Sequence, residues 1–286
     1  MRFDNGIARY VEFPEPAYDV EAEANPEFDT PAYRFHYQSF ITPPTVYDYE
    51  VAGGTLRALK RQEVLGDYDP ALYRVERLHA EAGDGTRVPI SFVSRKDSPR
   101  DGSSPLVLIG YGAYGIVASP VFSSNRLSLL DRGVSFAIAH VRGGGDLGKR
   151  WHDEGRMLRK CNTFTDFIAG AEFLVAAGLT SPDRLLIEGG SAGGLLIGAV
   201  VNMRPELFRG ALLRVPFVDV INTMLDESLP LTVGEFEEWG NPKIRAHYEY
   251  MKAYCPYTNL AERRYRAILV RSAFNDSQGM YWEPAE

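Results

Sequence analysis

A glycine-rich run at residues 189–194 contains the residue with the clearest chemical signature. The run reads Gly-Gly-Ser-Ala-Gly-Gly, places Ser191 in a GxSxG motif, and closely follows the apolar segment 185–187. A serine between very small neighbours on a sharp strand-to-helix turn is typical of a nucleophile elbow, which exposes the hydroxyl at the carboxyl end of a sheet. The segment 195–201 is predicted to be helical, so the start of its helix would face the negative charge of a reaction intermediate. We therefore predict that Ser191 is a catalytic nucleophile.

A serine hydroxyl is a weak nucleophile and requires a base that an acid holds in place. With this kind of elbow, the acid follows the serine in the chain and precedes a histidine base. Asp276 comes shortly after the apolar segment 267–270 and is the predicted catalytic acid. The alternative is that Asp276 only caps a turn, since aspartate side chains commonly bond to the backbone two residues ahead.

Two other glycine-rich segments are poor candidates for nucleotide binding. Residues 110–115 fit the pattern GxGxxG, but residues 116–124 contain a proline and β-branched residues and make a poor start for the helix that a dinucleotide site needs. Residues 143–150 nearly match the phosphate-binding pattern GxxxxGK, but Arg150 stands where a magnesium-binding hydroxyl is required. We interpret both segments as tight loops after strands, and we predict no cofactor and no metal.

The elements that must position these loops alternate between short apolar strands and helices. This alternation indicates an α/β fold with a mostly parallel sheet that helices cover on both faces. The predicted strands are 73–79, 88–94, 106–109, 134–138, 185–187, 211–213 and 267–270. The predicted helices are 164–177 and 195–201.

The chain before residue 67 has a different character. Residues 1–30 are acidic and rich in proline, with no clear periodicity. Segments 45–51 and 55–64 surround a Gly-Gly pair and predict a β-hairpin. Because an isolated hairpin is barely stable in water, residues 1–66 are expected to be the end of a larger β-structure or an extension packed on the rest.

The composition argues against several classes of protein. The net charge of -7 argues against nucleic-acid binding, which usually requires a basic face. The N-terminus shows no apolar run of the signal-peptide type, and no segment approaches the ~18 apolar residues of a membrane helix. Cys161 and Cys255 lie far apart, so we expect two free thiols in a reducing compartment. These features predict a cytoplasmic protein with neither nucleic-acid nor membrane partners.

Several long motifs resemble the prolyl oligopeptidase family, and in particular its oligopeptidase B branch. They are GGSAGG around Ser191, RSAFNDSQGMYWEPAE around Asp276, LIGYGAYG, and RLSLLDRG followed by AHVRGGGDLGKRWHDEGR. The resemblance runs from about Tyr37 through nearly the whole chain. It implies that residues 1–66 are the last strands of a β-propeller. It also implies that residues 67–286 are an α/β-hydrolase domain without its C-terminal end.

The resemblance implies a serine-type endopeptidase that cleaves short peptides after arginine or lysine through an acyl-enzyme. In that family a tyrosine matching Tyr111 donates its hydroxyl to the oxyanion, and the second donor would be the backbone N–H of Ala192. Glu235 and Glu237, in the segment GEFEEWG, match acids that bind the basic side chain. A guanidinium group can bind a carboxylate through two hydrogen bonds.

The extra acids that some relatives carry near the tyrosine loop are replaced by Ser119 and Val121, so a preference for a second basic residue is not indicated. The resemblance also places the catalytic histidine further along, in a C-terminal loop. All the histidines of this chain precede Asp276, namely His36, His79, His140, His152 and His247. We interpret these as structural. We expect the sequence to be a fragment truncated at both ends, whose sheet exposes apolar surface.

Two other functions stay open on the sequence alone. An esterase or lipase can be built on the same elbow, and it would prefer short acyl esters to arginyl amides. A hydrolase-like domain without catalytic activity would bind ligands but would not react with a serine-directed phosphonate. The missing histidine makes this second alternative a specific concern for the chain as it stands.

Overall fold

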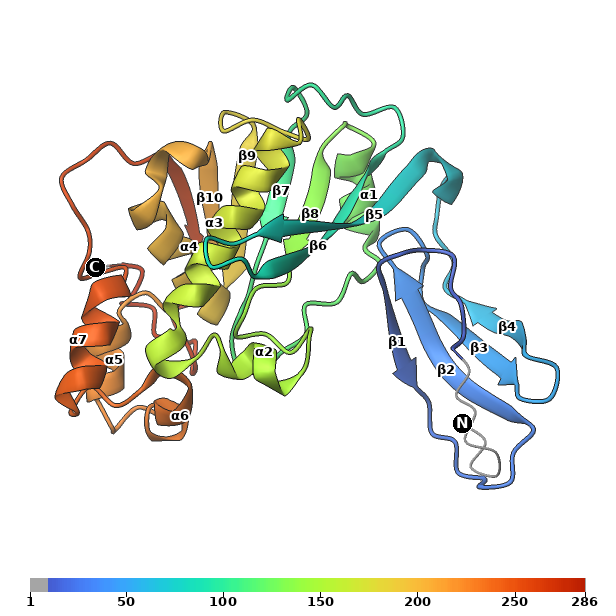
Figure 1. The fold of residues 1–286 in the computed structure, drawn as a ribbon, viewed down its shortest axis with the longest axis horizontal. Coiled ribbons are helices and arrows are strands. Elements are labelled where there is room, and N and C mark those ends of the chain that lie inside the picture. The colour runs from blue at the N-terminus through green and yellow to red at the C-terminus, as the bar shows by residue number, and fades with distance from the viewer. Residues whose placement is uncertain (1–9, 286) are drawn as a thin grey trace.

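The computed structural model describes residues 10–285, which form two β-sheets and the helices around the larger one (Figure 1). The smaller sheet is antiparallel, with the strand order β1-β2-β3-β4. Its strands are β1 (Tyr18–Ala22), β2 (Ala32–Ser39), β3 (Thr45–Glu50) and β4 (Thr55–Arg61). The predicted hairpin is confirmed as β3 and β4, whose turn includes Gly54 at a φ of 67°.

Strands β1 and β2 were not predicted, because charged residues and prolines hide their pattern. In β2 the aromatic side chains of Phe35 and Tyr37 are buried, and polar residues alternate with them. Phe13 packs on both rings, at centroid distances of 5.7 and 4.7 Å. Tertiary contact rather than local composition therefore stabilises this end of the sheet.

The larger sheet has seven strands in the order β11-β10-β9-β7-β8-β6-β5. The five strands from β11 to β8 run parallel, and β6 and β5 pair antiparallel at one edge. Its strands are β5 (Tyr73–Glu81), β6 (Arg87–Arg95), β7 (Leu106–Ile109), β8 (Ser135–Ala139), β9 (Leu185–Gly190), β10 (Gly210–Arg214) and β11 (Ala267–Arg271). This is the predicted mostly parallel sheet, and each of its strands overlaps a predicted segment.

Helices cover both faces of this sheet, with α3 (Cys161–Ala176) and α4 (Ala192–Met203) on one face and α1 (Ser124–Leu130) on the other. The other helices lie below the sheet in Figure 1 and are α2 (Lys149–Asp153), α5 (Val220–Leu225), α6 (Phe236–Trp239) and α7 (Arg245–Tyr254). Only α3 and α4 were predicted, because the others are short or carry mixed polar and aromatic residues. Short 3-10 turns lie at Pro70–Leu72, Met157–Arg159, Pro205–Leu207 and Val233–Glu235.

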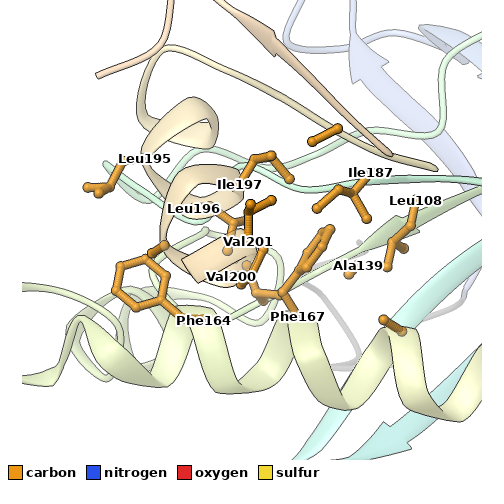
Figure 2. Packing of buried hydrophobic residues seen from close by; sticks show 14 of the residues in the cluster. Leu108, Ala139, Phe164, Phe167, Ile187, Leu195, Leu196, Ile197, Val200 and Val201 are labelled. Atoms are coloured by element: carbon orange, nitrogen blue, oxygen red, sulfur yellow. The ribbon is translucent and has the colours of Figure 1, made fainter. Parts of the chain in front are cut away.

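The core follows the alternation of side chains along the strands. In β7, Leu106 and Leu108 face the cluster that includes α3 and α4, whereas Val107 faces a second cluster with α1. Figure 2 shows Phe167 of α3 and Ile197 of α4 among the residues packed beside Leu108. The two helices thus fix the position of the loop before α4, where Ser191 lies.

The outer strand β11 exposes apolar side chains, as was expected of this sheet. Ile268, Leu269 and Val270 have exposed fractions of 46%, 65% and 41%. At the opposite side of the molecule, the small sheet lies next to the β5–β6 edge (Figure 1). There the Ser119 hydroxyl donates to Asp19 of β1 at 2.6 Å.

The predicted division between residues 66 and 67 falls in the connection between β4 and β5, and it stays a prediction. The arrangement is an α/β-hydrolase sheet preceded by antiparallel strands of the kind predicted for a propeller. Within residues 10–285 no helix combines the length and apolar character that crossing a membrane requires.

Candidate active site

Ser191 lies in a strained turn between β9 and α4. Its φ of 53° and ψ of -121° are values that non-glycine residues rarely adopt, and such strain is found at functional sites. A Cβ atom at Gly189 would lie 2.2 Å from the carbonyl oxygen of Gly193, so the turn requires glycine. The side chain of Ser191 is exposed. This is the geometry of a nucleophile elbow.

Tyr111 lies beside Ser191, in the loop that follows β7. Burial raises the pKa of the Tyr111 hydroxyl, and a side-chain hydrogen bond with Ser191 opposes that effect. The ring also packs against the elbow, because a Cβ atom at Gly193 would lie 3.4 Å from Cδ2 of Tyr111. Ala192 is the first residue of α4. The structure therefore brings both predicted oxyanion donors, the Tyr111 hydroxyl and the Ala192 backbone N–H, next to Ser191.

Ser191 and Tyr111 open into a cavity of about 310 Å³. Glu235 also lines this cavity and is the one charged side chain among its described lining residues. The Tyr114 hydroxyl donates to Oε1 of Glu235 at 3.0 Å, and the indole of Trp239 donates to Oε2 at 2.7 Å. Burial, together with the charge of Glu235, raises the pKa of Tyr114 far above its usual range. Tyr114 therefore keeps its proton and acts as a hydrogen-bond donor to Glu235. The carboxylate is therefore held in place.

The structure does not bring Glu237 to the cavity. Glu237 is exposed, and its backbone carbonyl accepts a hydrogen bond from Arg156 at 3.0 Å. The next residue, Glu238, points inward and is buried. It accepts hydrogen bonds from the backbone N–H of Tyr114 at 3.0 Å and from His152 at 2.7 Å. Sequence reasoning missed Glu238, because only the packing of α6 shows which of the two successive acids, Glu237 or Glu238, faces the interior.

Asp276 caps a turn at the edge of the cavity. It accepts hydrogen bonds from the backbone N–H groups of Gln278 at 2.9 Å and Gly279 at 3.0 Å. These two bonds hold the pKa of the Asp276 carboxyl below its usual value. Gln278 and Gly279 line the cavity together with Met280. The capping role and the proposed catalytic role are compatible, because the second carboxylate oxygen has no partner among residues 10–285.

None of the five histidines lines the cavity as far as the structure describes it. His140 is buried, with Nε2 2.7 Å from the Ser91 hydroxyl and Nδ1 2.7 Å from Asp146. His152 bonds to Glu238, and His247 accepts a hydrogen bond from the backbone N–H of Asn241. Their contacts are those of structural histidines, so none of them is placed to activate Ser191.

The two other glycine motifs have a common structural cause, since their loops touch through the backbone. A Cβ atom at Gly143 would lie 2.1 Å from the carbonyl oxygen of Gly112, and one at Gly145 would lie 2.1 Å from that of Gly115. The loop at 143–148 therefore supports the loop that carries Tyr111. The described residues also contain no cluster of histidine, cysteine, aspartate and glutamate side chains suited to a metal ion.

Comparison with known proteins shows the family to which the chain belongs. A description of the prolyl oligopeptidase family matches residues 120–286, which is more than half of the chain. The chain belongs to the prolyl oligopeptidase family. The chain is similar to dipeptidyl aminopeptidase BI of Pseudoxanthomonas mexicana. The two are 47% identical over 283 residues, which cover 99% of this chain and 39% of that protein. Protease 2 of Moraxella lacunata is 41% identical over 282 residues, covering 99% of this chain and 41% of that protein.

Solved structures from this family superpose closely on the chain. Oligopeptidase B from Leishmania major has a TM-score of 0.90 and 48% identity, covering 96% of this chain and 39% of that one. Oligopeptidase B from Trypanosoma brucei, with covalently bound antipain, has a TM-score of 0.90 and 45% identity over the same shares. The chain thus spans about two-fifths of the length of these relatives.

Proposed function

We propose that this member of the prolyl oligopeptidase family provides the reacting centre of a serine-type endopeptidase that cleaves short peptides after arginine or lysine. The observation that supports this most directly is that Ser191 and Glu235 line one cavity. A nucleophile and a fixed carboxylate in one cavity suit a substrate that has a carbonyl to attack and a cationic side chain to bind.

In the proposed reaction the Ser191 oxygen attacks the carbonyl carbon of the peptide bond while a base removes its proton. The oxyanion that forms accepts hydrogen bonds from the Tyr111 hydroxyl and the Ala192 N–H, each contributing roughly 3 kcal/mol to the stability of the transition state. The intermediate then expels the amine, which takes the proton from the base, and leaves an acyl ester on Ser191. Water, activated by the same base, hydrolyses this ester.

The base in this proposal is a histidine other than the five of this chain, because the site geometry places none of those five at Ser191. Asp276 is proposed to hold that histidine in the correct tautomer. Its free carboxylate oxygen and its place beside the cavity support this role. The proposal therefore predicts low turnover for the 286-residue chain by itself.

We also propose the partners, the domain organisation and the cellular location of the enzyme. The partners are short peptides with basic residues, and residues 1–66 and 67–286 are proposed to be a propeller remnant and a hydrolase domain. A cytoplasmic location is part of the proposal. It is supported by Cys161 and Cys255, which are both free thiols in the structure, since disulfides are rare in reducing compartments.

A chimera tests this proposal, with the chain inserted in place of the matching segment of Moraxella lacunata protease 2. The measurement is kcat/KM for matched arginyl, lysyl and phenylalanyl amides and for short acyl esters. We expect the two basic amides to be hydrolysed fastest. Faster hydrolysis of neutral esters would favour the esterase alternative. A folded chimera that reacts with no phosphonate would favour the non-catalytic binding domain.

The name of the Pseudoxanthomonas mexicana relative raises a second candidate, a dipeptidyl aminopeptidase. The same chimera separates the two activities with arginyl amides whose N-termini are either free or acetylated. An endopeptidase accepts acetylated peptides of several residues. Hydrolysis restricted to dipeptidyl amides with free N-termini would support the aminopeptidase.

A further inference from the structure

Lys160 is a buried lysine directly behind the cavity. It precedes α3, and its exposed fraction is 1%. Its ammonium donates a hydrogen bond to the carbonyl oxygen of Gly112 and lies 4.9 Å from the centre of the Trp239 indole ring. Burial lowers the pKa of Lys160 to about 8, although the charge of Glu238 acts in the opposite direction.

Burying the ammonium of Lys160 costs free energy of folding. An ammonium has three N–H donors, and within the described residues Gly112 is its one hydrogen-bond acceptor. Burying a charge without full compensation is strongly unfavourable. Contact with an aromatic face recovers part of this cost. Lys160 is therefore poorly explained as a residue that stabilises the core.

Its two contacts, Gly112 and Trp239, neighbour the proposed oxyanion donor and the proposed substrate-binding carboxylate. Gly112 follows the proposed oxyanion donor Tyr111, and the hydrogen bond from Lys160 fixes its carbonyl group. Trp239 donates to the carboxylate of Glu235. Lys160 thus contacts both the loop that carries Tyr111 and the Trp239 ring that holds Glu235, although Lys160 does not itself line the cavity.

Two further contacts hold the same parts together. Glu238 accepts a hydrogen bond from the backbone N–H of Tyr114 and one from His152. Elbow residue Gly193 also packs closely against this loop, at Gly110 and Tyr111. The loop is therefore held by the elbow, by Lys160 and by Glu238.

We propose that Lys160 is a positioning residue that sets the distance between the Tyr111 hydroxyl and the Glu235 carboxylate. This inference rests on the proposed function for its catalytic meaning, but the positioning itself is testable without turnover. The lysine fixes the spacing between the group that stabilises the oxyanion and the group that binds the first basic side chain.

The test replaces Lys160 by a neutral side chain of similar length, Lys160→Met. Its matched control is Lys252→Met, because Lys252 also lies over an aromatic ring, that of Tyr248 at 5.9 Å, but is exposed. The first readout is the ¹H–¹⁵N signal of the Trp239 indole in the 286-residue chain, assigned with Trp239→Phe. The second is the thermal midpoint of unfolding. The third is kcat/KM of the chimera for an arginyl amide.

We expect Lys160→Met to shift or broaden the Trp239 indole signal. The unfolding midpoint should fall, because the variant leaves the Gly112 carbonyl oxygen without its donor and removes a positive charge near the buried Glu238. In the chimera, kcat should fall by about 100-fold, the order expected when a catalytic group moves by about 1 Å. Lys252→Met should change none of the three. An unaltered indole signal, or an unchanged kcat of the chimera, would overturn the proposal. If the wild-type chimera proves not to be a peptidase, the proposed function fails, while the indole signal still decides whether Lys160 positions Trp239 and the Glu235 carboxylate that it binds.

Discussion

The indole N–H of Trp239 donates to the carboxylate of Glu235 at 2.7 Å, and the two residues are one helical turn apart. The Tyr114 hydroxyl occupies the other oxygen of the same carboxylate at 3.0 Å. The acid of the cavity is thus oriented before any substrate binds, which lowers the entropy cost of binding. Predictions about specificity follow from this fixed carboxylate.

Glu235→Gln should selectively weaken the binding of cations. The change keeps the shape of the side chain but removes the counter-charge, so the loss should be about 2–5 kcal/mol for an arginyl substrate and small for a neutral one. Binding of N-butylguanidinium and of neutral N-butylurea to the chain, measured by titration calorimetry, checks this. Glu237→Gln is the matched control, since Glu237 is exposed and does not line the cavity. Equal losses for both ligands would make Glu235 a structural residue.

Gly193→Ala should displace Tyr111 and reduce turnover. The added Cβ atom would lie 2.7 Å from the carbonyl oxygen of Gly110 and 3.4 Å from Cα of Tyr111, so the backbone of this loop would have to shift. We expect a loss of roughly 3 kcal/mol in transition-state stabilisation, the effect of removing one oxyanion donor. The measurement is kcat of the chimera, with Gly234→Ala as the control because a Cβ atom there meets no atom within 4 Å. An active Gly193→Ala chimera would contradict the role of this loop.

Asp276→Asn should leave the turn folded but impair catalysis. An asparagine oxygen can still accept the hydrogen bonds from Gln278 and Gly279, so the unfolding midpoint at neutral pH should change little. Turnover of the chimera should fall by roughly 10⁴, as in another serine protease whose triad aspartate was changed to asparagine. Retained turnover would leave Asp276 with its capping role alone.

Glu283 predicts a pH dependence of stability. Its buried carboxylate accepts hydrogen bonds from the backbone of Val218 and Asp219 and from Thr223, yet burial raises its pKa to about 7. The folded state therefore holds this proton more tightly than the unfolded state, whose carboxyl has a pKa near 4.5. The resulting stability is fully present below pH 4.5 and is lost as pH rises to about 7. The loss should be about 3 kcal/mol.

Glu283→Gln removes this titration while keeping the shape of the side chain. The unfolding midpoint of the variant, relative to the wild type, should therefore rise between pH 5 and pH 7 and then level off. Glu237→Gln, at an exposed carboxyl, is the control. A constant difference between variant and wild type across this range would show that Glu283 is ionised in both states.

Much of the fold was predictable because the central parallel strands, such as β7 and β8, are buried on both faces and read as apolar runs. The prediction of 106–109 coincides with β7, and the elbow was readable because only very small residues fit around Ser191. Helices such as α7 were missed, since their apolar residues are interspersed with tyrosine, histidine and charged residues.

The supporting residues of the site were not predictable. Lys160 stands in the basic run RMLRK, where nothing local indicates that one lysine is buried while Arg159 is exposed. The choice between Glu237 and Glu238 depends on how α6 packs against Tyr114, a contact between residues 124 positions apart. Such positions are determined by tertiary packing, which no local pattern encodes.

The most direct test of the central claim is covalent labelling of Ser191 by an arginyl phosphonate, located by peptide mass spectrometry. The account predicts that the chimera is labelled at Ser191, that Ser191→Ala abolishes the label, and that the 286-residue chain alone reacts much more slowly. Loss of the base in another triad enzyme lowers turnover by about 10⁶. A label that persists in Ser191→Ala, or equal rates for the chain alone and the chimera, would contradict the account.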